Sequence, residues 1–386
     1  MKICIVTVAY NRPDCLLRLL DSLKRADYPE PVPLIISVDK SDTDSVEHLA
    51  DEFVWPYGEK IVARHAENMG LRAHMLSLGR YFEEYDALVV LEDDTYVSSS
   101  FYHYVKACVE CDYADPLVAG ISLYAFRQNY QTGLPFSPAP SAYDVYLMQC
   151  AQSWGEVWMK DSWQRFSSWY ETHSDDFSLP HLPDALNSWP HTSWLKYHTR
   201  YCIEQGRYFV YPYFSHSTNN ADRGSNSAAS DTCHQAPLMT FPKTEYRLPD
   251  VAQCPVRYDG FFEPMFLADA LGLPESELTV SLLGELKQTH RRYLLTRHTL
   301  PYKVLRSFAM ELRPVEMNVL TNRSGFDIFL YDTCQSGPSP ASPDPYRLYH
   351  YLFPNAFFKA RTMIGFRRMC SLQLQLVWKK ICSVVR

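Results

Sequence analysis

The chain has 386 residues, of which 46% are apolar and 21% charged, so it can bury a sizeable core and is not expected to be disordered. A net charge of −7 argues against a general nucleic-acid binder. The eleven cysteines are irregularly spaced. They lack the repeated close pairs of a zinc site and favour reduced thiols in a reducing compartment.

The first residues, MKICIVTVAYNRPD, combine one lysine with a short apolar run and no small-residue cleavage site. We interpret them as a first strand rather than a signal peptide. No apolar stretch reaches 18 residues, so we expect no membrane-spanning helix. The expected location is the cytoplasm.

The first 125 residues alternate strand-like and helix-like runs. Lys2–Ala9 is apolar and β-branched, as a buried parallel strand should be, and Pro13 and Asp14 open a leucine-rich helix. Further strands are predicted at Leu34–Val38, Lys60–Arg64, Ala87–Leu91 and Val118–Tyr124, and helices at Thr43–Phe53, Leu71–Tyr85 and Ser100–Cys111. This order predicts an α/β fold with a doubly wound, mostly parallel sheet flanked by helices.

The later part of the chain is less regular. Tyr143–Phe214 is rich in Trp and Tyr, and Asn219–His234 has the small polar composition of a mobile loop. Asp250–Leu312 is predicted to mix a loop with helical segments, and Ile328–Asp332 to be a further strand. Ser336–Pro345 has the proline and serine content of a linker.

Polar clusters follow each of the first four predicted strands. They are Tyr10-Asn11-Arg12, Asp39-Lys40-Ser41-Asp42, His65-Ala66-Glu67-Asn68 and Glu92-Asp93-Asp94. Ligands bind at the carboxyl ends of strands in open α/β sheets. A single cluster would be ordinary loop polarity, whereas four that converge on one rim predict a site.

The most informative cluster is Glu92-Asp93-Asp94, which a buried strand delivers to that rim. Adjacent ionised carboxylates repel one another, so they call for a cation. Mg²⁺ and Mn²⁺ bind one or two carboxylates and complete their shell with substrate phosphates. The alternative is a solvated turn that caps the helix starting at Ser100.

The N-terminal part resembles the GT-A-fold glycosyltransferases, close to bacterial family 2-like enzymes and N-acetylglucosaminyltransferase I. The matching stretches, which lie within residues 2–235, are VTVAYNRPDCLLRLLDSL, HAENMGLRAH, LVVLEDDTYVSSSFY and SWGEVWMKDSW. The resemblance implies a nucleotide-sugar donor and a divalent metal, Mn²⁺ or Mg²⁺, bound by Asp94. It further implies donor binding by Tyr10, Asn11, Arg12, Asp39, Asn68, Arg72, Glu92 and Asp93.

The stretch from Gln152 to Trp163 is similar to the family's acceptor-side segment, with Trp154 and Gly155 as candidate acceptor contacts. Direct displacement needs a base, for which Glu156 in its aromatic setting is the first candidate. Related enzymes have an Asp after a later Trp, where this chain has Leu195 after Trp194. Asp161 or Asp184 therefore remain alternative bases.

Two histidines flank the predicted mobile loop, and His216 or His234 is a possible third metal ligand. Each has the alternative of being structural or solvated. The loop itself is a candidate to close over bound donor and exclude water.

The resemblance divides the chain into a catalytic domain at 1–245, an extension at 246–335, a linker at 336–346 and a basic amphipathic tail at 347–386. The catalytic domain comprises a nucleotide-sugar half at 1–125 and an acceptor half at 126–245. Phe357–Arg386 carries seven basic and no acidic residues, so it can lie on a membrane surface or pack on the protein. A C-terminal helical extension and a peripheral membrane location are therefore expected.

The leading hypothesis is an inverting, metal-dependent hexosyl- or N-acetylhexosaminyltransferase in surface polysaccharide or glycoconjugate synthesis. Its acceptor would be a glycan or a lipid-linked glycan. One alternative is a sugar nucleotidyltransferase, which would normally have a Gly-rich loop after the first strand. Another is a catalytically inactive glycan-binding or scaffold protein, which the missing acid after Trp194 would explain.

Overall fold

The computed structural model describes residues 1–111, 115–220, 222, 234–284, 286 and 291–352, with a few single positions between 365 and 378. The predicted mobile loop at Asn219–His234 and the basic segment Phe357–Arg386 therefore lie largely outside the described residues. Within the described part of the chain, no helix is long and apolar enough to cross a membrane.

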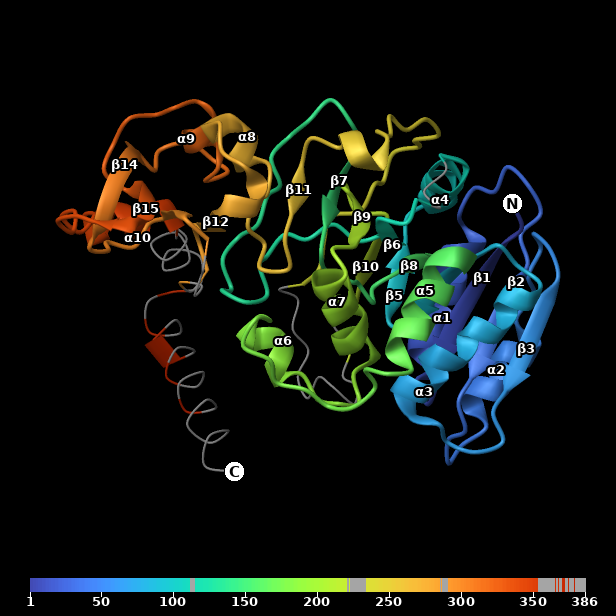
Figure 1. Ribbon diagram of the computed structural model, residues 1–386. Coiled ribbons are helices and arrows are strands. Elements are labelled where there is room, and N and C mark those ends of the chain that lie inside the picture. Colours follow the sequence, from blue (N-terminus) through green and yellow to red (C-terminus); the bar gives the residue numbers. More distant parts are fainter. Residues whose placement is uncertain are drawn as a thin grey trace.

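A nine-stranded sheet in the order β11-β7-β9-β6-β8-β4-β1-β2-β3 forms the centre of the molecule (Figure 1). Its strands are β1 (Ile3–Ala9), β2 (Leu34–Val38), β3 (Lys60–Arg64), β4 (Ala87–Glu92), β6 (Val118–Ser122), β7 (Val145–Met148), β8 (Glu156–Met159), β9 (Tyr208–Pro212) and β11 (Arg257–Tyr258). Most neighbouring pairs are parallel, but β8 is antiparallel to both β4 and β6, and β7 is antiparallel to β9. The predicted α/β fold with a mostly parallel sheet is confirmed.

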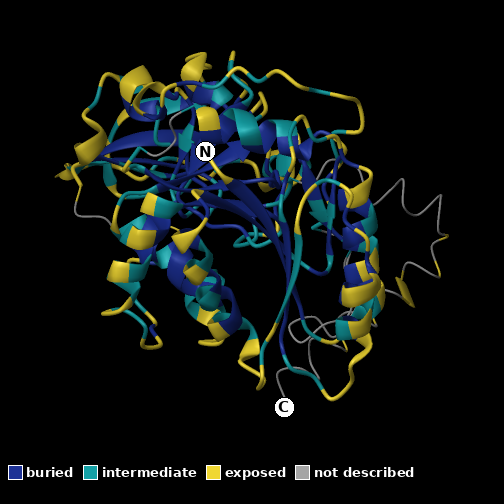
Figure 2. Cartoon of the chain, turned by 90° about the vertical axis from the view of Figure 1, so that its right-hand side faces the viewer, coloured by how far each residue is buried: buried dark blue, intermediate teal, exposed yellow. Residues whose placement is uncertain are grey.

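Helices cover both faces of this sheet, because its strands carry apolar side chains on both sides. One face packs against α1 (Pro13–Lys24), α2 (Ser45–Glu52) and α4 (Phe101–Glu110). The other packs against α3 (Gly70–Ser77), the 3₁₀ helix η1 (Leu78–Glu83), α5 (Lys160–Tyr170) and α7 (Trp194–Glu204), and the short α6 (Asp184–Ser188) contributes to a smaller cluster beside α7. Figure 2 shows the buried sheet between more exposed helices.

The predicted helix at Leu71–Tyr85 is two elements, because α3 ends at Ser77 and η1 follows it. Gly79 lies in η1 against Trp163 of α5, so closely that a Cβ on Gly79 would come within 2.3 Å of the indole nitrogen. This close packing is a tertiary contact that helical periodicity does not reveal.

A two-stranded antiparallel sheet lies beside the large one. It pairs β5 (Thr95–Val97) with β10 (Ser217–Asn219). The pairing brings the residues that follow β4 next to a segment more than 100 positions away in sequence.

The extension after β11 is built on a second sheet, in the order β12-β13-β15-β14 (Figure 1). Its elements are η2 (Val251–Gln253), α8 (Leu267–Leu271), η3 (Glu275–Glu277), β12 (Leu278–Ser281), β13 (Tyr293–Thr296), β14 (Tyr302–Phe308), α9 (Met317–Leu320) and β15 (Ile328–Ser336). The predicted strand at Ile328–Asp332 is confirmed as part of β15. The prediction of only loop and helix for Asp250–Leu312 is wrong, because three strands of this sheet lie there.

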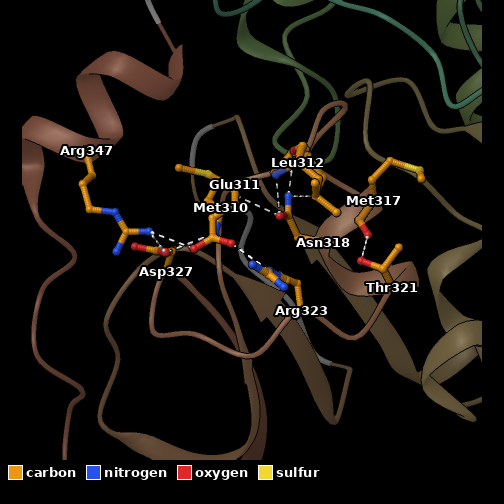
Figure 3. A network of polar contacts seen from close by, with 10 residues as sticks. Met310, Glu311, Leu312, Met317, Asn318, Thr321, Arg323, Asp327 and Arg347 are labelled. Atoms are coloured by element: carbon orange, nitrogen blue, oxygen red, sulfur yellow. Dashed lines mark hydrogen bonds and ion pairs between the residues drawn. The ribbon is translucent and has the colours of Figure 1, made fainter.

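Side-chain hydrogen bonds hold the irregular segments on either side of α9 in place (Figure 3). Asn318 accepts from the main-chain N–H groups of Glu311 and Leu312 at 2.9 and 2.8 Å, and its Nδ2 donates to two carbonyls. Asp327 accepts from Met310 N and from Arg347 of α10 (Pro345–Leu352). The helix after the linker is thereby attached to the second sheet.

Candidate functional site

The acid turn, Glu92-Asp93-Asp94, ends β4 and meets Arg12 at the end of β1. Arg12 Nε lies 3.2 Å from Asp93 Oδ2, its second terminal nitrogen is also bonded to Asp93, and Nη1 lies 3.4 Å from Asp94 Oδ2. Parallel strands β1 and β4 are neighbours, so their carboxyl ends deliver these groups to the same edge. Two of the predicted strand-end clusters are thus in direct contact.

The carboxyl groups of the acid turn differ in how readily they ionise, because burial affects them to different extents. It raises the pKa of Glu92 to about 8, with the nearby Asp94 and Asp93 carboxylates adding to the effect and Arg12 and a hydrogen bond to Trp194 opposing it. Burial also raises the pKa of Asp93 to about 6, although Arg12 favours its ionised form. Glu92 thus favours its protonated form more strongly than Asp93, which is paired with Arg12.

The fit to a divalent cation rests on Asp94. One of its carboxylate oxygens contacts Arg12, while Oδ1 is buried without a hydrogen-bond partner among the described residues. An unpaired buried carboxylate oxygen suits a hard cation, which prefers oxygen ligands. No described group of three or more His, Cys, Asp or Glu residues is arranged to hold a metal.

The contacts of His216 favour the structural alternative over a role as metal ligand. Its Nδ1 lies 3.2 Å from Ser98 Oγ and its Nε2 lies 3.4 Å from Tyr246 OH, so both nitrogens have partners. The ring stacks on Tyr104 at 4.7 Å, and burial lowers its pKa to about 3. His234 instead contacts Trp154, with 5.2 Å between ring centroids.

The predicted donor residues after β2 and β3 meet at the start of α3. The buried Asp39 carboxylate accepts from the main-chain N–H groups of Met69 and Gly70 at 2.9 and 3.0 Å. Asn68 Nδ2 donates to Lys40 O at 2.9 Å. Asp39 and Asn68 therefore hold this part of the rim together, while Tyr10 and Asn11 lie between β1 and α1.

Arg72 of α3 points toward the middle segment of the chain. Its Nε donates to Tyr170 OH at 2.6 Å, and its terminal nitrogens donate to the carbonyls of His191 and Ser174 at 2.9 and 2.5 Å. The guanidinium also lies 4.1 Å from the ring centroid of Tyr197. These contacts give Arg72 a structural role, and the predicted diphosphate contact would have to compete with them.

The acceptor-side segment enters the large sheet through β8. Gly155 precedes it with φ +95, and a Cβ there would come within 2.9 Å of Ser217 Oγ and 3.2 Å of Leu91. Ser217 Oγ donates to the Trp154 carbonyl. The half-buried Trp154 ring packs edge-on against Tyr124 at 4.9 Å.

Glu156 lies at the rim end of β8 but is entirely buried. It pairs with Val90, two residues before Glu92, and neither carboxylate oxygen has a hydrogen-bond partner within the described structure. Burial, reinforced by Glu92, raises its pKa well above the ordinary value. The environment of Glu156 thus favours its neutral form, although Trp158 opposes the shift, and its side chain is out of reach of solvent.

The two alternative bases lie in different places. Met159 pairs with Ala87 at the start of β4, and Lys160 N donates to Asp86 O at 2.9 Å. Asp161 therefore lies beside the start of β4, whereas the acid turn lies at its end. At ~3.3 Å per residue, the length of β4 separates the two by roughly 20 Å. This position argues against Asp161 as the base. Asp184 is exposed at the start of α6. It lies seven residues before His191, whose carbonyl accepts a hydrogen bond from Arg72 of α3.

Several residues near the acid turn were missed by sequence reasoning. Asn220 donates to the Asp94 carbonyl through its main-chain N at 3.0 Å and its Nδ2 at 3.3 Å. Asp222 forms an ion pair with Arg18 of α1 and acts electrostatically on Asp93. Composition identified this stretch only as a polar loop, because nothing in the sequence indicates the pairing of β10 with β5.

Comparison with known proteins finds a match to the family described as Glycosyl transferase family 2 over residues 4–106. This segment contains Arg12 and the acid turn. A search of curated proteins gave no significant match.

Solved structures show partial similarity. The fragment 1–349 of S. aureus TarS in complex with UDP-GlcNAc is 12% identical, with 58% of this chain and 60% of that fragment covered at a TM-score of 0.37. GalNAc-T7 with UDP, GalNAc and Mn²⁺ is 14% identical, with 55% and 42% covered at 0.37. A Pyrobaculum calidifontis mannosyltransferase with GDP-Man and Mn²⁺ is 13% identical, with 48% and 50% covered at 0.31. The chain thus spans about 60% of the TarS 1–349 fragment and 33% of the longer TarS structure, and similarity at this level does not decide its activity.

Proposed function

We propose that this protein is a glycosyltransferase that moves a sugar from a nucleotide-diphosphate donor to an acceptor hydroxyl. The observation that carries the proposal is the contact of Arg12 with Asp93 and Asp94 at the ends of adjacent parallel strands. These residues lie inside the segment that matches glycosyl transferase family 2. They would place a positive and a negative group where a nucleotide-sugar diphosphate binds.

Asp94 would hold a divalent cation, Mn²⁺ or Mg²⁺, through its unpaired Oδ1. When bound, such an ion neutralises charge on a departing diphosphate. Arg12 would then be able to exchange its contact with Asp94 for a phosphate oxygen, since a guanidinium suits both anions. Asp93, which keeps its bonds to Arg12 Nε and Nη2, would hold that side chain in position.

The acceptor would enter beside Trp154, whose half-buried indole offers a flat face to a sugar ring. The acceptor proton requires a base in contact with the reacting hydroxyl. We assign this role to Asp184, because it is exposed and lies between Ser174 and His191, which Arg72 of α3 contacts, whereas Glu156 is buried with a raised pKa. The proposal also includes an inverting reaction, a hexosyl or N-acetylhexosaminyl donor, and a glycan or lipid-linked glycan as the acceptor.

The first experiment is calorimetric titration of UDP-, GDP-, dTDP- and CMP-sugars with and without Mn²⁺. We expect metal-dependent binding of one nucleotide class, lost in Asp94→Ala. Asp161→Ala is the matched control, because that acid lies at the other end of the sheet, and it should bind like wild type. Absence of binding by well-folded wild-type protein would rule out the transferase proposal.

The assignment of the base is tested by steady-state transfer once a donor is known. Asp184→Asn should lower kcat by about 10²- to 10⁴-fold, with little change in donor affinity. Glu156→Gln, which keeps a neutral side chain of the same shape, should retain kcat within a few-fold. The reverse pattern would return the role to Glu156.

A second candidate function is glycan binding without catalysis. It is favoured by Leu195, which stands where related enzymes have an acid, and by the sealed carboxyl of Glu156. In that case glycans would bind near Trp154 while no nucleotide sugar is consumed. Glycan-array binding that is lost in Trp154→Ala, together with no transfer in the presence of Mn²⁺, would favour this function.

A further inference from the structure

The outer face of α10 is aromatic, where a surface helix ordinarily carries charged and polar groups. Leu348 and Tyr351 pack against the apolar cluster of the second sheet. Tyr346 and Tyr349 are instead 70% and 49% exposed. Because residues three positions apart lie on the same side of a helix, these two tyrosines share one side of α10, and it is not the side of Leu348 and Tyr351.

The described positions of the C-terminal tail are exposed as well. Arg367, Cys370, Ser371, Leu374 and Trp378 are all helical, and their spacing places them along one side of a helix. Leu374 and Trp378 are 70% and 68% exposed. This side of the tail is therefore not packed against the rest of the protein, which argues against the alternative that it covers the catalytic domain.

Charge is distributed very unevenly along the chain. All 44 acidic residues precede Pro345, whereas the 42 residues from Pro345 onward contain eight basic residues. The C-terminal part is thus positive in a chain whose net charge is −7. It combines this charge with exposed tyrosine, leucine and tryptophan side chains.

This combination fits the surface of a lipid bilayer. Tyrosine and tryptophan join an apolar ring to a polar group, so they suit the boundary between hydrocarbon and water. Basic residues close to that boundary are attracted to anionic lipid headgroups. No helix of the described residues is long and apolar enough to cross a membrane, so the contact would lie in the plane of the interface.

We propose that the outer face of α10, together with the side of the tail that contains Leu374 and Trp378, binds the surface of a bilayer that contains anionic lipids. The extension would then hold the protein at the membrane, because Arg347 of α10 is bonded to Asp327 beside β15 at 3.1 Å. The proposal goes beyond the transfer reaction and does not depend on it.

The test is co-sedimentation of the full-length protein with lipid vesicles. One set contains phosphatidylcholine alone, and the other an equal mixture of phosphatidylcholine and phosphatidylglycerol. We expect binding to the mixed vesicles that weakens as the salt concentration rises, and much weaker binding to phosphatidylcholine alone. Equal binding to both sets, or no binding to either, would overturn the proposal.

Trp378→Ser tests the apolar part of the contact. It should weaken binding to the mixed vesicles by at least about tenfold, because the indole no longer enters the interface. The matched control is Phe241→Ser, since Phe241 is 79% exposed and lies outside the extension and the tail. The control should bind within about twofold of wild type. Wild-type binding by Trp378→Ser, or an equal loss in both variants, would contradict the proposal.

Arg367→Glu tests the electrostatic part. Reversal of this charge should weaken binding to the mixed vesicles by about tenfold or more, whereas Arg367→Lys keeps the charge and should bind within about twofold of wild type. An equal loss in Arg367→Lys would show that the guanidinium makes a specific contact instead, and would refute attraction to the lipid charge.

Sedimentation velocity without vesicles tests whether a second copy of the chain occupies this face. Wild type and Trp378→Ser should sediment alike. A wild-type dimer that Trp378→Ser dissociates would assign the face to contact between copies and overturn membrane binding. Failure of the proposed function is seen separately, because donor titration requires no vesicles.

Discussion

Glu156 begins β8 with both carboxylate oxygens buried, within the same apolar cluster as Trp158. A carboxyl in such a place is held in its neutral form, because ionisation would put an uncompensated charge in a low-dielectric interior. The aromatic sequence around Glu156 predicted a raised pKa, and the direction of that shift is confirmed. The sequence did not indicate that the group is closed to solvent.

This protonated carboxyl predicts a pH-dependent stability difference between wild type and Glu156→Gln. The folded state binds the Glu156 proton more tightly than the unfolded chain does, because its pKa is raised in the folded state. The resulting stability is complete below the ordinary pKa and declines as pH rises toward the folded-state pKa, by up to about 1.4 kcal/mol per pH unit. The side chain in Glu156→Gln does not titrate, so this pH-dependent loss of stability is absent from the variant.

We therefore expect wild type to lose stability relative to Glu156→Gln as the pH rises above the ordinary pKa of glutamate. Urea unfolding of both proteins at several pH values measures the difference. Because Glu92 acts on the pKa of Glu156, the measured difference reports the two carboxyl groups together. Parallel stability curves would show that Glu156 is ionised in the folded protein.

Gly155 gives a second prediction at the residue scale. Its φ of +95 and the nearby Ser217 Oγ, Leu123 and Leu91 leave no room for a Cβ. Gly155→Ala should lower the free energy of unfolding by about 2–4 kcal/mol, because backbone strain and steric overlap add. Chemical denaturation measures this.

The matched control for Gly155 is Gly206→Ala. Gly206 also has a positive φ, +60, but no atom lies within 4 Å of the position that an added methyl group would take. Strain alone should cost about 1 kcal/mol there. Equal losses at both glycines would mean that the contacts around Gly155 relax without cost.

Among the elements, α3 is held near its N-terminus by two different parts of the chain. Asp39 accepts from the N–H groups at its start, and Arg72 attaches it to the segment between Tyr170 and His191. Helical periodicity predicted an α-helix here that continued to Tyr85. It could not reveal the partners of Arg72, because they lie about 100 residues away.

Arg72→Lys tests whether this arginine is structural. Lysine cannot reproduce the planar set of hydrogen bonds to Tyr170, His191 and Ser174, so stability should fall by about 2 kcal/mol. The control is Arg80→Lys, whose guanidinium donates to the adjacent Tyr81 and should change stability little. Thermal unfolding provides the comparison.

Donor titration then separates the two roles of Arg72. If the guanidinium is structural, the lysine variant should bind nucleotide sugar within a few-fold of wild type at a temperature where it is folded. A large loss of donor affinity with unchanged stability would instead restore the predicted contact with the diphosphate.

For the whole molecule, a buried polar link joins the extension to the large sheet. Tyr258 of β11 donates to Glu316 beside α9 and accepts from Ala139 N at 2.8 Å. Burial raises the pKa of Glu316 to about 7, opposed by its bond to Tyr258. The second sheet is thus linked to the large one through a tyrosine hydroxyl that is bonded on both sides.

Tyr258→Phe should destabilise the protein by about 2–3 kcal/mol, because it leaves a buried N–H and a buried carboxyl without their partner. Tyr208→Phe is the control, since that hydroxyl contacts the weak acceptor Met265 Sδ at 3.4 Å. Scanning calorimetry would show the loss. A change no larger than in the control would mean that water replaces the hydroxyl.

The sequence by itself determined most of the elements of the first 125 residues and their order. Apolar runs such as Lys2–Ala9 and Ala87–Leu91, with helices between them, specify a parallel sheet because local periodicity and the rule for strand connections suffice. The same logic placed Arg12 and the acid turn at one edge of that sheet. These features depend on neighbours in sequence, so no distant contact was needed to predict them.

Only the tertiary structure decided the rest of the site and the extension. The antiparallel insertion of β8 between β4 and β6 buried Glu156 and sent Asp161 to the far end of the sheet. The pairing of β10 with β5 brought Asn219 to the acid turn. The second sheet could not be predicted from the sequence, because two of its strands are only four residues long and their burial follows no regular alternation. Each result depends on contacts between residues far apart in the chain, whose free energy leaves no local pattern in the sequence.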